Sequence, residues 1–345
     1  MSLLTILLVV FLVLLVLGVG ALWVLRIVIR RWLMKKIAAQ DAARGGMAAR
    51  ITLVPTAQPW RQAGTPGLVD PLVAAGYVEV GRFDVPEIQT MRLWAGVHPQ
   101  DGSTAAIYDH GTVPPFFDLV RVYDDYATCT VTTNPIHDPA NVPPDCTCIA
   151  DRTLSPASAR VVLCDQPLRE GVMRVDAANF TTIFAELYAR AIEHILTKNQ
   201  PDAAKMRETG RRMAEAQGLP APELDDAQMD LAVELHRVSR LAALQEAILE
   251  RFAGSGEVAA TEWARLRDRV VVVHDLLGRE EAAEIARAAS DRRTSQPIID
   301  AVLAEQLPPI DTFERITAQL PAPQRLRLVG EVDHPLYAQI VVAND

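Results

Sequence analysis

The chain has 345 residues, and its 34 lysines and arginines stand against 43 aspartates and glutamates, a formal net charge of −9. Residues 1–50 hold seven of the basic residues and one acid, which leaves 27 basic and 42 acidic residues in 51–345. A region with this acidic excess repels phosphate backbones, because nucleic-acid binding depends on clustered basic side chains. The charge balance therefore argues against nucleic acid as a partner.

The first predicted element is an uncharged run of leucine and valine over residues 3–25. At about 1.5 Å per residue, a helix of this length covers the roughly 30 Å of bilayer hydrocarbon. No basic residue precedes the run and no small-residue cleavage site follows it, which distinguishes it from a secretory signal peptide. We therefore predict a single transmembrane helix within an anchor formed by residues 1–36.

Basic side chains follow this run but do not precede it. Those within about 20 residues of its C-terminal end are Arg26, Arg30, Arg31, Lys35, Lys36 and Arg44. Because lysine and arginine near a membrane span stay in the cytoplasm, we expect a single-pass protein with its large domain there. Arg30, Arg31, Lys35 and Lys36 would also attract anionic lipid headgroups, at about 1 kcal/mol per charge.

Residues 37–65 are interpreted as a linker with a short strand at 51–54, and residues 66–175 as a strand-rich module. The module opens with a helix over 66–75, for which Gly76 supplies a left-handed cap. Short runs of Val, Thr, Tyr and Phe between turn residues then predict strands. They are 77–83, 90–95, 104–108, 117–123, 128–133 and 160–164. Their spacing, without helical patterns between them, favours an antiparallel meander.

Residues 176–320 are predicted to be mainly helical, because the apolar spacing changes to that of a helix with Asp176 as N-cap. Phe184 and Leu187 of the first helix should pack against the strand module. The predicted helices are 176–196, 202–217, 225–252, 261–277, 280–289, 296–306 and 311–319. Residues 321–345 hold two strands that form a terminal hairpin, expected to pair with the earlier sheet. The predicted fold class is α+β with an N-terminal transmembrane helix.

Four segments, 76–87, 105–110, 120–125 and 128–133, together resemble a module of uncharacterised bacterial single-pass membrane proteins. The resemblance covers residues 76–133. It implies a bacterial source, and with the predicted anchor it implies a place in the inner membrane. It implies no substrate, cofactor or catalytic residue.

The four cysteines, Cys129, Cys146, Cys148 and Cys164, suit a reduced compartment. In a strand, Cys146 and Cys148 would share one face, but structural zinc usually requires two closely spaced pairs and the outer cysteines stand alone. We expect them to act as small apolar residues that bind no metal. A metal or redox site at these four residues is the alternative.

Two pairs of candidate catalytic residues, Asp109 with His110 and His137 with Asp138, fall in predicted loops, where catalytic groups are common. No zinc-protease motif, nucleophile elbow or phosphate-binding loop is present, so no cofactor is predicted. The sequence favours a membrane-anchored interaction or scaffold protein, for example an accessory subunit of a membrane complex. The alternative is a membrane-tethered enzyme that uses these loop residues.

Overall fold

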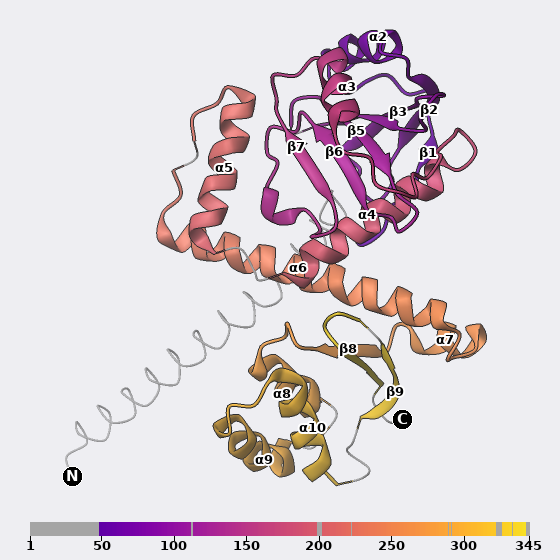
Figure 1. Cartoon of the computed structure of the whole chain (residues 1–345). Coiled ribbons are helices and arrows are strands. Elements are labelled where there is room, and N and C mark those ends of the chain that lie inside the picture. The colour runs from indigo at the N-terminus through magenta and orange to yellow at the C-terminus, as the bar shows by residue number, and fades with distance from the viewer. Residues whose placement is uncertain are drawn as a thin grey trace, which may run out of the picture.

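The computed structural model describes residues 48–342, except for 112, 199–201, 222, 289, 291, 322–325 and 333. The predicted anchor, residues 1–36, and the linker up to residue 47 lie outside these ranges. No helix within them is both long and apolar enough to cross a bilayer. The described chain is a mixed α+β structure with a large, mostly antiparallel sheet and a C-terminal β-hairpin, as predicted (Figure 1).

The larger sheet has seven strands in chain order. They are β1 (Val54–Pro55), β2 (Val78–Asp84), β3 (Met91–Val97), β4 (Thr104–His110), β5 (Phe116–Val122), β6 (Thr128–Thr132) and β7 (Thr147–Ala150). Each strand up to β6 pairs antiparallel with the next, whereas β7 pairs parallel with β6. The predicted meander is therefore confirmed for β2–β6, and the strand β7 was not predicted.

One predicted strand of this module is wrong, because residues 160–164 lie in the helix α3 (Pro156–Asp165). Ser155 is the N-cap of α3 and accepts a hydrogen bond from the backbone of Ser158, while Pro156 occupies the first turn. Both are strong local signals for a helix start. Ala159 and Leu163, four residues apart, are fully buried on one face of α3, so helical packing overrides the β-propensity of the valines.

The two faces of the sheet bury separate apolar clusters. On one face, Trp94, Ile107 and Leu119 pack against α3 and α2 (Pro66–Ala74), whose last turn leads into the predicted left-handed glycine, Gly76, at φ +97°. A side chain at Gly76 would lie 2.6 Å from the imidazole of His98, so the site also needs glycine for space.

The opposite face packs against α4 (Phe180–Thr197), whose Phe180 and Ile183 are buried against Phe83 and Leu93. Phe184 and Leu187 pack at the edge of this cluster, partly buried. The N-cap of α4 is Asn179 instead of the predicted Asp176. The carboxylate of Asp176 instead accepts hydrogen bonds from the backbone of the turn that precedes the helix.

Two predicted helices are confirmed nearly to the residue. The helix α5 (Ala203–Gln217) begins after its N-cap Asp202 and ends at Gly218. The helix α6 (Asp226–Ser255) begins with a capping box between Asp225 and Gln228 and ends at Gly256. Side-chain caps at the start and left-handed glycines at the end define these helices locally.

The predicted helix over 261–277 is wrong in its second half, since α7 (Ala260–Leu266) is followed by the strand β8 (Val270–His274). Four successive valines favour a strand, and four of the five residues of β8 are buried. The remaining elements are α8 (Arg279–Ala288), α9 (Arg292–Ala304), α10 (Pro309–Gln319), β9 (Arg327–Val332) and β10 (Ala338–Val342).

The terminal hairpin does not pair with the larger sheet, as had been expected, but forms a three-stranded sheet in the order β8-β10-β9. One face of this sheet packs against α8, α9 and α10. The other packs against α6 through Phe252, which lies over Gly330 so closely that a Cβ atom there would be 2.3 Å from its ring. Figure 1 shows α6 running between the two sheets.

Candidate functional site

The first predicted pair, at the end of β4, serves the local fold. The carboxylate of Asp109 is fully buried and accepts hydrogen bonds from the backbone nitrogens of Arg61 (2.5 Å) and Gln62 (3.1 Å) and from the hydroxyl of Thr65 (2.9 Å). It therefore fixes the segment that leads into α2. The Nε2 atom of His110 lies 3.2 Å from the hydroxyl of Thr90, and burial lowers the pKa of this imidazole.

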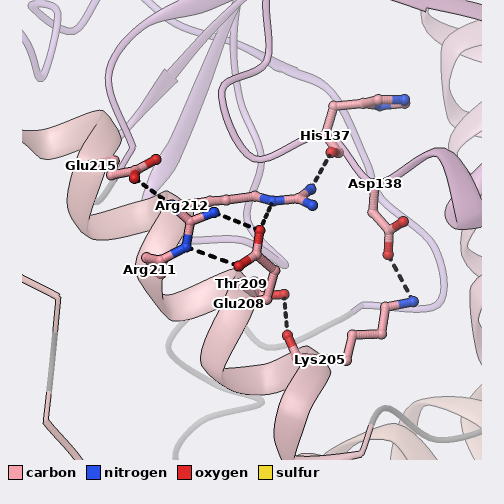
Figure 2. Close-up of polar contacts among 8 residues, drawn as sticks. All are labelled: His137, Asp138, Lys205, Glu208, Thr209, Arg211, Arg212 and Glu215. Carbon is pink, nitrogen blue, oxygen red and sulfur yellow. Dashed lines mark hydrogen bonds and ion pairs between the residues drawn. The ribbon is translucent and has the colours of Figure 1, made fainter.

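The second predicted pair joins the β6–β7 loop to α5 (Figure 2). The carbonyl of His137 accepts from the Nη1 atom of Arg212 at 3.2 Å, and its ring extends away from this contact. Asp138 accepts a hydrogen bond from the backbone of Ala140 and forms an ion pair of 2.8 Å with Lys205. Neither His137 nor Asp138 is bonded to Asp109 or His110 in the described structure.

Glu208 is the centre of the ion pairs on α5. It contacts Arg211 and Arg212, each at 2.8 Å, and Arg211 also pairs with Glu215. The hydrogen bonds from the two arginines lower the pKa of Glu208 to about 2. Because these groups are exposed, the network docks the loop onto the helix and contributes little to stability.

The four cysteines do not form one site among the described residues. Cys129 is buried in β6, Cys148 lies in β7, Cys146 precedes β7 and Cys164 is exposed on α3. The sulfur of Cys148 is 4.0 Å from the Nδ1 atom of His137. Burial, followed by the nearby Asp118, raises the pKa of Cys148 to about 12, so it is a neutral thiol and a poor nucleophile. Within the described ranges no three His, Cys, Asp or Glu side chains are arranged to hold a metal.

A buried carboxylate that the sequence interpretation missed lies beside Cys148. Asp118 projects from β5 and receives hydrogen bonds from the hydroxyls of Tyr108 and Thr132. Its Oδ1 atom is buried without a partner among the described residues. Burial raises its pKa to about 6. The signal for this group was a charged residue inside the otherwise alternating strand Phe116–Val122.

The described structure also contains an open groove of about 370 Å³ on α6 and α7. Its apolar lining consists of Ala242, Leu249 and Ala253 from α6 and Trp263 from α7. The ring of Trp263 is fixed edge-on to Phe252, with centroids 5.4 Å apart. The α6 residues recur at helical spacing beside the core face of α6, and Leu249 and Trp263 also pack against the core cluster there.

The groove is also lined by charged side chains: two carboxylates, Glu246 and Glu250, and one guanidinium, Arg267. Burial, together with the neighbouring Glu250, raises the pKa of Glu246. The Nε atom of Arg50 lies 3.1 Å from Glu250, and its Nη1 atom lies 3.6 Å from Glu186 of α4. Arg50 therefore ties the start of the described chain to the wall of the groove.

This groove combines a concave apolar surface with charged side chains at its edge, whereas the predicted His–Asp pairs are engaged in local contacts. It is a candidate for a binding site in the described residues. No match was found when the chain was compared with known protein families, curated proteins and solved structures.

Proposed function

We propose that this protein is a membrane-anchored interaction protein that uses the groove on α6 and α7 to bind a basic polypeptide segment. The supporting observation is the composition of the groove: three aliphatic side chains and an indole provide apolar area, and Glu246 offers a carboxylate that Arg50 does not pair with. Apolar contact with opposite charge at the edge is typical of helix-in-groove recognition. The predicted anchor would present this groove to other segments at the membrane surface.

The alternative of a membrane-tethered enzyme has less support. The carboxylate of Asp109 accepts three hydrogen bonds, and Asp138 forms an ion pair with Lys205. The contact between Cys148 and His137 is long, and the high pKa of the thiol opposes formation of the thiolate that covalent catalysis requires. The geometry therefore favours binding over catalysis.

A site-specific cross-link tests the proposed function. The photoreactive residue p-benzoyl-phenylalanine is placed at Gln245 in the groove and, as a control, at the exposed Leu231 on the same helix. The full chain is irradiated in its native membrane. We expect an adduct at position 245 that is absent at 231, and its attached peptide should contain lysine or arginine beside apolar residues. Equal adducts at both positions, or none at 245, would contradict the proposal.

A further inference from the structure

The groove lies where the N-terminal segment joins the described fold. Ala49 and Ile51 are buried, with 4% of each exposed, and the intervening Arg50 forms ion pairs with Glu250 and Glu186. Glu250 is itself part of the groove lining, so the described chain begins at the edge of the groove.

The N-terminal segment is basic, and in the groove Glu246 is the carboxylate that Arg50 does not pair with. Residues 26–47 contain six lysines and arginines and the single acid Asp41. Burial, followed by the like-charged Glu250, raises the pKa of Glu246, and Arg267 partly offsets this rise. A cation placed beside Glu246 would relieve this repulsion.

The residues that precede the described chain also match the groove in side-chain size and in length. Residues 37–47 include four alanines and no aromatic side chain, and small residues allow close approach to a floor that includes Ala242 and Ala253. The α6 part of the groove spans about 16 Å, from 1.5 Å per residue. Eleven residues extend to roughly 36 Å, so the segment is long enough to follow it.

We propose that residues 35–47 of the same chain occupy this groove, with Lys35, Lys36 and Arg44 directed to Glu246 and the alanines against the apolar floor. The inference rests on the proposed function, because it names the basic segment that the groove binds. Tethering at Arg50 gives the segment an effective concentration of about millimolar, so weak contacts suffice. The same lysines are predicted to meet anionic lipid, and the groove and the membrane surface therefore compete for them.

Isotope mixing identifies the occupant. Unlabelled and ¹⁵N-labelled full-length chains with the photoreactive residue at Gln245 are mixed in detergent, irradiated, digested and analysed by mass spectrometry. We expect the adduct peptide to derive from residues 35–47, with both halves carrying the same label. The control at Leu231 should give no such peptide.

Charge reversal provides a second measurement. Glu246→Lys should reduce the intramolecular adduct about threefold to fivefold, as expected for loss of a partly exposed ion pair, and Lys35→Glu with Lys36→Glu should restore it. Asp230→Lys makes the same charge change about 24 Å away on α6 and should have no effect. Because a lysine in the groove can disturb folding, Glu246→Gln is measured in parallel and should give a smaller reduction.

The outcomes separate this inference from the proposed function. Adducts with mixed labels would assign the groove to a second copy, and adducts to another protein would assign it to a partner; either result overturns occupation by residues 35–47 but leaves a binding groove. An unchanged yield in Glu246→Lys would also overturn it. Absence of any groove-specific adduct would overturn both proposals.

Discussion

Asp118 and His274 are buried titratable side chains, and burial shifts their pKa values in opposite directions. Burial raises the pKa of Asp118 to about 6, so the folded state binds a proton more tightly than the unfolded state. Burial and the nearby His334 lower the pKa of His274 to about 4, so folding favours its neutral form. As the pH falls from 7 to 4, Asp118 therefore adds stability and His274 removes it.

Asp118→Asn should stabilise the protein at pH 8, because the charged, partly unpartnered carboxylate is replaced by a neutral amide of similar shape. A shift from about 4 to about 6 corresponds to at most about 3 kcal/mol, and we expect a gain of roughly 1–3 kcal/mol. The gain should fall by about 1–2 kcal/mol at pH 4.5 and vanish only below the unfolded pKa of about 4. Urea unfolding at both pH values measures it, with the exposed Asp70→Asn as control. A loss of stability at pH 8 would show that the carboxylate has a partner in solution.

His274→Asn should flatten the decline in stability between pH 6.5 and pH 4. The Nδ1 atom of His274 accepts a hydrogen bond from the backbone of Leu276 at 3.2 Å, and the asparagine carbonyl offers a similar acceptor. His274 is 2% exposed, and its depressed pKa corresponds to about 3 kcal/mol lost by acidification. Unfolding free energies measured at intervals across this range test the slope. Parallel curves for variant and wild type would rule out His274 as the source.

At the scale of elements, the C-terminus of α4 depends on an arginine from another helix. Arg240 of α6 is 3% exposed, and it donates to the carbonyls of Leu196 (2.7 Å) and Ile195 (2.9 Å). A cation at a helix C-terminus satisfies free carbonyls and interacts favourably with the helix dipole. The sequence could not reveal this contact, because Arg240 follows Leu196 by 44 residues and Ile195 by 45 residues in the chain.

Arg240→Met should lower the unfolding free energy by roughly 1–3 kcal/mol, since it keeps the buried stem but removes the arginine donors, which leaves the carbonyl of Ile195 with only the 3.4 Å bond from the Lys198 backbone. The exposed ion pair of Arg207 with Asp226 offers a control, and Arg207→Met should cost less than about 1 kcal/mol. Chemical denaturation measures both. Equal losses in the two variants would mean that the cap contributes no more than a surface contact.

Elements with local end signals were predictable, and elements defined by distant partners were not. The caps at Asp202 and Asp225 gave the limits of α5 and α6, and Gly76 ended α2. The valines of 270–273 continued an apparent helix, because their role as a strand depends on pairing with β10 far along the chain. The same applies to β7, whose strand partner in the described part of the sheet is the parallel β6.

The candidate site was less predictable than the fold. His137 and Cys148 were both singled out in the sequence and do lie close together, but their surroundings make the thiol inert. The groove was not foreseen. It requires α6 and α7 to meet at an angle after Gly256, and the interpretation of 261–277 as one long helix did not provide that geometry.

For the whole molecule, the orientation in the membrane remains a prediction from the basic flank of residues 3–25. A fluorescent reporter fused to the C-terminus should be active, because the large domain is expected in the cytoplasm. A periplasmic alkaline phosphatase fused at the same place should be inactive and serves as the reciprocal control. The opposite pattern would reverse the orientation and expose the cysteines to an oxidising compartment.

The position of Arg50 also determines how the fold would respond to mechanical load. Force applied at the N-terminal side acts first on the ion pairs of Arg50 with Glu186 and Glu250 and on the buried Ile51. It then acts on the two-residue strand β1. Force is thereby divided between α4 and α6, two helices that pack on each other. Because Ile51 belongs to the apolar cluster between the larger sheet and α4, and exposed ion pairs are weak, most of the tension would pass into that cluster.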